Sequence, residues 1–206
     1  VSQNALFFEI SDGAVFAGNF FLDCNQSIYV LNSANVEVYN NTMINSRVQF
    51  SRDSRGDQLG VFGWHDTTGP RVEERHGHVF VNNLMYMSGE NTSPMLQTQQ
   101  SSSLCERLST PHLKSLNNNI FIRGDAAGEN KIPTIRWTPY PDDDCSIDIF
   151  SPEELSKIIP EFCTKCQYFE NYQGPLFADI KNNDYRLVKA FPGIKAAAEI
   201  PDRIVR

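Results

Sequence analysis

Four short segments of the chain share one pattern of apolar and polar residues around an asparagine. In each segment, an apolar residue stands three places before the asparagine and another stands two places after it. Because successive side chains of a strand point to opposite faces, this pattern predicts two short strands joined by a bend, with both apolar columns in the core. The asparagines are Asn19, Asn41, Asn83 and Asn119; the apolar columns are Phe16, Val38, Phe80, Leu116 and Phe21, Met43, Met85, Phe121.

The spacing of these segments indicates how the strands are arranged. Asn19 and Asn41 are 22 residues apart, and the strand before them repeats at the same interval at Leu6, Ile28 and Phe50. Asparagine tolerates the left-handed conformation of a tight bend, and stacked asparagines can hydrogen-bond as a ladder. A period in the low twenties made of short strands is typical of a solenoid. An antiparallel sandwich with asparagine-rich turns is the alternative, but the spacing shared on both sides of the bend favours coils.

The repeat is interrupted twice. Asn83 follows Asn41 by 42 residues, which leaves room either for one degenerate coil with a strand at Val61-Phe62 or for a long excursion. Many glycines and charges favour the excursion, and long loops in compact domains tend to be functional. We therefore predict coils over residues 1–150 with loop insertions at 51–77 and 88–112.

The C-terminal part, residues 151–206, is predicted to cap the last coil. Ser151-Pro152-Glu153-Glu154 is a strong helix start, with serine as N-cap, proline at the first helical position and a capping-box glutamate. Leu155, Ile158, Ile159 and Phe162 give this short helix one apolar face. Solenoids need such a cap to cover the final rung.

These features resemble a known group of proteins. The asparagine bends, followed by Gly174-Pro175-Leu176-Phe177, Asp184-Tyr185-Arg186-Leu187 and Pro192-Gly193-Ile194, are similar to the C-terminal part of bacterial right-handed parallel β-helix proteins of the pectin-lyase-like superfamily. The resemblance covers most of residues 4–194. It implies an all-β, right-handed parallel β-helix with a long lateral loop and a C-terminal cap containing one short helix. Such proteins are mostly secreted lyases or glycoside hydrolases that act on polysaccharides, and others are tail spikes or adhesins. No family-specific catalytic motif is present, so the resemblance assigns no catalytic residue.

Composition narrows the possible partners. The net charge of −7, the isoelectric point near 5.1 and the lack of a basic run argue against nucleic acid. No apolar stretch approaches the ~18 residues of a membrane span. The sequence starts at Val1 inside a strand-like segment, so an upstream domain of the same protein is a further expected partner. The main predicted partner is a polysaccharide or oligosaccharide, and no cofactor is predicted.

The excursion at 51–77 concentrates the residues that could carry chemistry. Three of the four histidines, His65, His76 and His78, lie in it or directly after it, and it holds one of the two tryptophans. Hydrolysis of a glycosidic bond needs two carboxylates, which Asp66 with Glu73 or Glu74 could provide. A lyase needs a base and cations that neutralise a uronate, for which His76 and two arginines are suited. A loop whose charges only pair with one another is the structural alternative.

The predicted site therefore has catalytic and binding members in this loop. The catalytic candidates are Asp66, Glu73 and His76, and the substrate-binding candidates are Trp64, His65, Arg71 and Arg75. His76-Gly77-His78 lacks a third ligand at a suitable spacing, so no metal site is predicted. The predicted function is cleavage of a polysaccharide as hydrolase or lyase, and the alternative is a non-catalytic glycan-binding or structural module.

The five cysteines agree with an extracellular or periplasmic location, because disulfides persist in oxidising compartments. Cys163 and Cys166 form a C-x-x-C pair, but neither a zinc site nor a redox motif has the expected surroundings. We predict one or two disulfides in the cap, between Cys145 and either Cys163 or Cys166. The odd number leaves at least one free thiol.

Overall fold

The structure is a computed structural model that describes residues 3–53, 71–124, 131–142 and 144–205. Within these residues, strands predominate and most of them pair in parallel. They form three sheets and one small hairpin, and three short α-helices complete the described chain. The prediction of a mostly β protein with parallel strands is thus confirmed.

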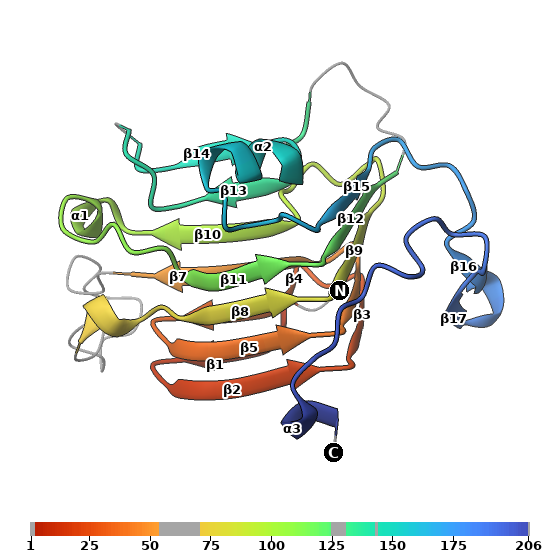
Figure 1. Ribbon diagram of the computed structural model, residues 1–206, viewed down its shortest axis with the longest axis horizontal. Coiled ribbons are helices and arrows are strands. Elements are labelled where there is room, and N and C mark those ends of the chain that lie inside the picture. Colours follow the sequence, from red (N-terminus) through yellow and green to blue (C-terminus); the bar gives the residue numbers. More distant parts are fainter. Residues whose placement is uncertain (1–2, 54–70, 125–130, 143, 206) are drawn as a thin grey trace.

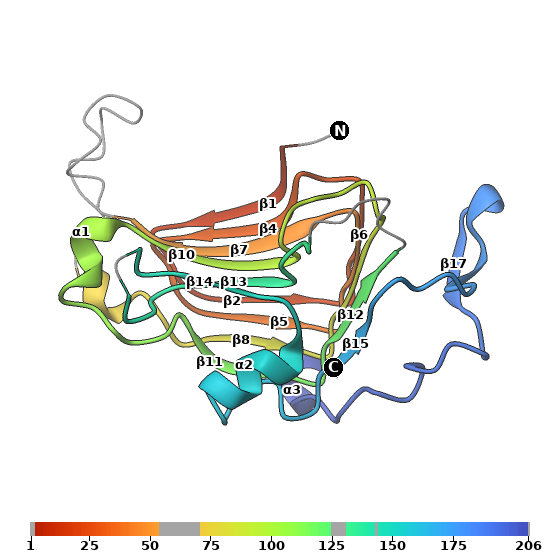
Figure 2. The same ribbon diagram turned by 90° about the horizontal axis from the view of Figure 1, so that it is seen from above.

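Each of the three larger sheets collects strands from distant parts of the sequence (Figures 1 and 2). The first sheet contains β1 (Asn4–Glu9), β4 (Gln26–Leu31), β7 (Arg47–Arg52), β10 (Leu96–Gln100), β13 (Ile135–Trp137) and, antiparallel at its end, β14 (Ile147–Ile149). The second contains β2 (Asp12–Ala17), β5 (Ala34–Tyr39), β8 (His78–Val81) and β11 (Leu113–Asn117). The third contains β3 (Phe20–Leu22), β6 (Thr42–Ile44), β9 (Leu84–Met87), β12 (Ile120–Arg123) and β15 (Gln167–Phe169).

The chain passes through the three sheets in turn, and we call each passage a rung. The rungs are residues 4–22, 26–44, 47–87 and 96–123. The predicted loop at 88–112 contains β10 and α1 (Ser102–Cys105), and η2 (Val72–Glu74) precedes β8. The C-terminal part holds α2 (Pro152–Ile158), β16 (Phe177–Asp179), η3 (Ile180–Asn182), β17 (Asp184–Leu187) and α3 (Asp202–Val205), so it has a second α-helix where one was predicted.

The asparagine ladder is confirmed. The side-chain oxygen of Asn41 accepts hydrogen bonds from the backbone N–H and the amide of Asn19, both at 2.9 Å. Asn83 accepts from Asn41 at 3.1 and 3.0 Å, and Asn119 accepts from Asn83 at 2.9 and 3.2 Å. Each rung is therefore fixed to the next by two bonds to one oxygen.

The ladder asparagines were expected to adopt the left-handed conformation of the bend, and this expectation is wrong. Positive φ angles fall on the residue just before it, at Gly18, Asn40, Asn82 and Asn118. That residue turns the backbone, and the next residue is then free to direct its side chain along the stack. Glycine and asparagine tolerate this conformation best.

Both predicted apolar columns lie in the core. Phe16, Val38, Phe80 and Leu116 pair in this order across the second sheet, and Phe21, Met43, Met85 and Phe121 do so across the third. Except for half-buried Phe16, all of them are less than a tenth exposed. The first-sheet column is shifted, however: Leu6 pairs with Ile28, but Phe50 pairs with Val30. An irregularity at the start of β4 brings Val48 beside Ile28.

The helix start at Ser151 and the number of disulfides are confirmed, whereas the predicted pairing of Cys145 with Cys163 or Cys166 is wrong. The Ser151 hydroxyl accepts from the Glu154 N–H at 3.3 Å, and Leu155 is fully buried in the main core. Cys145 is bonded to Cys105, and Cys163 is bonded to Cys166. The fold brings the Cα atoms of Cys105 and Cys145 within 6.0 Å although they are 40 positions apart, a proximity that the sequence does not reveal; Cys163 and Cys166 are neighbours in the chain, with Cα atoms 4.7 Å apart, and bond to each other. Cys24 has a free thiol.

The ladder predicts unequal effects for two asparagines in the same column. Replacing Asn83, which is 1% exposed, by alanine removes the acceptor for Asn41 and the donor to the Val38 carbonyl at 3.0 Å. Buried groups left unpaired should lower the free energy of unfolding by ~2–4 kcal/mol. Asn19→Ala, at the exposed end of the column, is the matched control and should cost under ~1 kcal/mol. Urea unfolding measures both, and equal losses would contradict the ladder's role.

Candidate functional site

The third sheet is apolar on both of its faces. Its inward column belongs to the core, and its outward positions Leu22, Ile44, Tyr86 and Ile122 pair in this order across β3, β6, β9 and β12. If such a face stays exposed to water, the fold loses about 25 cal/mol of hydrophobic stabilisation for each Å² of apolar surface. The outer face therefore requires a cover.

The C-terminal segment supplies this cover. Ile44, Leu84, Ile120 and Ile122 form a second hydrophobic cluster with residues that come more than fifty positions later, Leu176, Phe177 and Phe191. Phe177 begins β16, so the β16–β17 hairpin, at the right of Figure 1, is anchored in this cluster. The hairpin covers only part of the sheet, so a groove remains between them.

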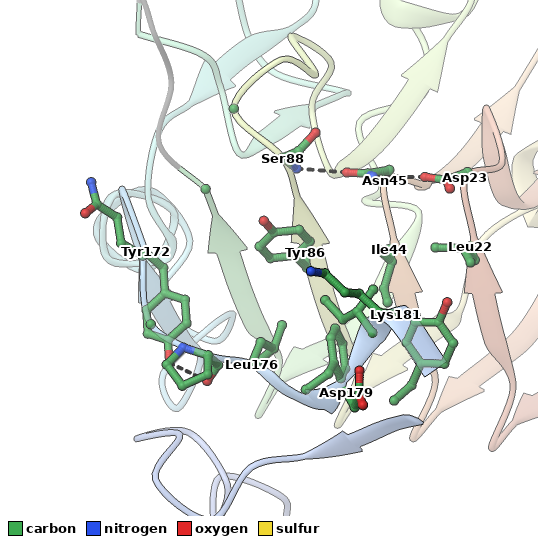
Figure 3. Close-up of a pocket in the computed structure, with 18 of the residues that line it drawn as sticks. Leu22, Asp23, Ile44, Asn45, Tyr86, Ser88, Tyr172, Leu176, Asp179 and Lys181 are labelled. Carbon is green, nitrogen blue, oxygen red and sulfur yellow. Dashed lines mark hydrogen bonds between the residues drawn. The ribbon is translucent and has the colours of Figure 1, made fainter. Parts of the chain in front are cut away.

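This groove is the candidate functional site (Figure 3). It has a volume of about 1060 Å³ and runs between the third sheet and the hairpin. One wall contains Leu22, Ile44 and Tyr86, and the opposite wall contains Tyr172, Tyr185 and residues 173–181. A concave site with an apolar lining and a few polar groups is the usual form of a ligand pocket.

Two of the groove's tyrosines are placed by glycines. A Cβ atom on Gly124 would lie 3.1 Å from the Tyr86 hydroxyl, and one on Gly174 would lie 2.6 Å from the Tyr172 hydroxyl. Each ring thus passes close to a backbone position that has no side chain. The Tyr172 hydroxyl also donates to the Pro175 carbonyl at 3.2 Å. These contacts hold both rings at the groove.

A polar row follows the edge of the groove. The Asn45 amide donates to the Asp23 carboxylate at 2.9 Å, and the Ser88 N–H donates to the Asn45 side-chain oxygen at 2.8 Å (Figure 3). Asp23 and Asn45 both have positive φ angles, which turns the chain out of β3 and β6. The row presents hydrogen-bonding groups beside the apolar wall.

The charged groups of the groove are mostly acidic. Among the described residues that line it, Asp23, Glu90 and Asp179 are acidic and one is basic, Lys181, which extends toward Tyr86 in Figure 3. Asp179 caps η3, because its carboxylate accepts from the backbone and side chain of Asn182 at 3.3 and 2.6 Å. Glu90 is exposed on the segment after β9. An excess of carboxylates disfavours phosphorylated ligands.

A second hollow adjoins the groove and shares Asp23 and Asn45 with it. Its volume is about 590 Å³, and its other lining residues include Arg47, Asn91 and Ser93. Buried Arg123 fixes this wall, because its guanidinium donates to the carbonyls of Asn91 and Ser93 at 2.8 and 3.2 Å. The groove and the hollow follow each other along the same corner of the fold.

The described residues of the predicted site, Arg71, Glu73, Arg75 and His76, lie at the other end of the strands, at or beside η2 at the left of Figure 1. Arg71 pairs with Glu74 at 3.0 Å, and both side chains are more than half exposed. Glu73 is exposed and His76 is half-buried, with a pKa lowered by burial and by the charge of Arg52.

Arg75, another predicted binding residue, is buried rather than presented to a ligand. It is 7% exposed, and its guanidinium donates to the Ser11 carbonyl at 3.5 Å. Trp64, His65 and Asp66 lie outside the described residues. Whether the loop forms a catalytic site therefore stays a prediction.

The groove was not found from the sequence. Its walls come from the third-sheet strands and from residues 172–185, far apart in the chain. A partial signal was present, because Phe20-Phe21-Leu22, Leu84-Met85-Tyr86 and Ile120-Phe121-Ile122 are apolar at every position. Such strands are buried on both faces, and this points to a covering segment.

The most strongly shifted titratable groups belong to neither site. His78 is 2% exposed, and its Nδ1 accepts from the Val36 N–H at 3.1 Å, so the ring is neutral. Burial, together with the charges of His76, Arg52 and Lys114, lowers its pKa to about 3. Burial also holds the pKa of His112 well below its ordinary value and lowers that of Arg52 to about 10.

In the described part of the chain, no three metal-ligating side chains cluster together, and no helix is long and apolar enough to cross a bilayer. Comparison with protein-family models, with curated proteins and with solved structures found no match for this chain.

The buried histidines predict a pH-dependent stability. Because the folded pKa of His78 is lowered, the unfolded chain binds the extra proton between about pH 6.5 and 3. The free energy of unfolding has its full value above pH 6.5. It falls as pH decreases, by up to ~1.4 kcal/mol per pH unit for each such histidine. His78→Asn retains an acceptor for the Val36 N–H and should give a shallower slope between pH 6.5 and 4.5. Urea unfolding measures the slope, and identical slopes would contradict the assignment.

Proposed function

We propose that the described strands form a right-handed parallel β-helix whose groove binds a polysaccharide or oligosaccharide. Support for the fold comes from the repeated passage through three parallel sheets and from the asparagine ladder. The observation that carries the function is the groove itself, where tyrosine rings adjoin a row of amide and carboxylate groups. The proposed setting is extracellular or periplasmic, which the two disulfides favour.

A carbohydrate fits this combination of groups. A pyranose ring has an apolar face of C–H groups that packs on an aromatic ring, and its hydroxyls need donors and acceptors at the rim. Tyr86 and Tyr185 supply rings, and Asp23, Asn45 and Ser88 supply polar groups. The adjoining hollow continues along the same corner, so a linear glycan could extend from one into the other.

Binding is favoured over cleavage by the state of the groove's carboxylates. Two of them already have structural hydrogen bonds, Asp23 with Asn45 and Asp179 with Asn182. Cleavage by hydrolysis is the second candidate, since Glu90 after β9 and Asp179 at the end of β16 both line the groove and hydrolysis needs two carboxylates. The alternative catalytic set in the loop, Asp66, Glu73 and His76, would act at a different place.

The binding proposal predicts that Tyr86→Ala weakens glycan affinity at least about tenfold, equivalent to ~1.4 kcal/mol. The loss follows from removing the ring against which a sugar would pack. Calorimetry against neutral, amino-sugar and uronic-acid oligosaccharides provides the measurement. Tyr29→Ala is the matched control, because Tyr29 is also half-buried and stacks on an aromatic ring, that of Phe7 at 5.2 Å, but lies on the first sheet.

A milder variant tests the geometry. Gly124→Ala places a methyl group against the Tyr86 hydroxyl and should weaken binding less than loss of the ring does. No binding by the unaltered protein across the panel, or equal losses in the Tyr29 and Tyr86 variants, would refute the groove as a glycan site.

Cleavage is tested separately. If the groove hydrolyses its ligand, Glu90→Gln should reduce the release of reducing ends at least ~100-fold while binding persists. If the loop is catalytic, Glu73→Gln should do so instead. Activity that neither substitution changes would remove both carboxylates from the mechanism.

A further inference from the structure

The first rung has three strand edges with nothing paired beyond them in the described chain. β1, β2 and β3 are each the last member of their sheets, whereas the strands of the second rung are paired on both sides. All three edges lie at the same end of the molecule, the end away from α2 in Figure 1. Unpaired edges are templates for further strands.

The hydrogen bonds between rungs show what these edges are built to receive. The N–H of Ala34 donates to the Ser11 carbonyl, and that of Thr42 donates to the Asn19 carbonyl, both at 2.9 Å. The equivalent N–H groups in the first rung are those of Asp12 and Phe20. They point away from the second rung and have no acceptor among the described residues.

Side-chain acceptors repeat in the same direction. Each rung's acceptors are filled by the rung before it: Ser33 accepts from the Ser11 N–H at 3.2 Å, and Asn41 accepts from Asn19. In the first rung the corresponding oxygens are those of Ser11 and Asn19. Within the described chain, neither receives such a donor.

The apolar interior is also open at this end. Val36 and Val38 of the second rung are completely buried, whereas Ala14 and Phe16, which pair with them, are only half-buried. The end thus combines apolar surface with N–H groups and acceptors that no described residue fills, arranged as one rung presents them to the next.

We propose that this end is an interaction surface for a further polypeptide rung, which adds one parallel strand to each of β1, β2 and β3. The chemistry of the partner is specified by the surface: carbonyls opposite the N–H groups of Asp12 and Phe20, and a backbone N–H and an amide opposite the Asn19 side-chain oxygen. This inference does not depend on the proposed glycan binding.

A second copy of the chain does not satisfy this surface. Two copies related by a two-fold axis would pair their edges antiparallel and would place acceptor against acceptor at Asn19. Stacking copies head to tail is also blocked, because the far edge of the first sheet ends in antiparallel β14, against which α2 packs. The surface therefore selects a parallel rung.

Amide exchange measured by NMR tests the proposal on the protein itself. The Asp12 and Phe20 amides should exchange at least ~100-fold faster than those of Ala34 and Thr42, their bonded equivalents one rung later. Equal protection in monomeric protein would show that the edge is already covered and would overturn the proposal.

A variant then adds a further rung. Residues 3–24 are duplicated directly before residue 3, which preserves the spacing of 22 residues. Exchange at Asp12 and Phe20 of the original copy should slow at least ~100-fold, and Asn19→Ala in that copy should reduce the gain. An extension of the same residues in scrambled order is the control and should have no effect.

The amides of Leu84 and Ile120, bonded to the Asn41 and Asn83 carbonyls at 2.9 Å, report that the remaining rungs stay folded in every variant. Unchanged exchange at Asp12 and Phe20 in a folded extended variant would overturn the proposal. So would a dimer, detected by light scattering, whose formation protects these two amides in the unextended protein.

Discussion

The hydrogen-bond requirement of buried asparagine amides fixes the register of the whole structure. Asn41, Asn83 and Asn119 are nearly inaccessible to solvent, and an unpaired amide in that environment costs several kcal/mol. Their groups are satisfied only when each rung stacks directly on the next. A slip of one residue would break the ladder and turn the apolar columns outward. The register is therefore set by the hydrogen bonds between ladder asparagines, and it does not depend on how many residues separate one asparagine from the next.

This explains where the chain tolerates insertions. The bend between the second and third sheets always consists of two residues, from Gly18-Asn19 to Asn118-Asn119. Extra residues enter only at the other two corners, between β7 and β8, between β10 and β11, and between β9 and β10. The groove's polar row and the adjoining hollow lie at the corner that leads from the third sheet to the first. Function can vary there without disturbing the ladder.

How much of this could be predicted depended on how local the signal was. The ladder and both apolar columns could be predicted because their pattern repeats along the sequence. The Ser151 helix start could be predicted because its motif lies within four residues. The shift of Phe50 was not visible, because it depends on an irregularity in the pairing of β4. The bond from Cys105 to Cys145 and the groove between Tyr86 and Lys181 were also missed, because both join segments that only the folded chain brings together.

The same bends also organise the outside of the molecule. Asn82, which has the left-handed conformation, donates to the Ala198 carbonyl at 2.6 Å and accepts from the Ala198 N–H at 2.9 Å. Asn118 donates to the Ala196 carbonyl, and Arg203 pairs with Glu37 at 2.6 Å. The C-terminal segment thus crosses the second sheet rung by rung. In the pairs Asn82-Asn83 and Asn118-Asn119, the second residue fixes the register inside and the first holds the tail outside, so each of these dipeptides aligns the core with its cover.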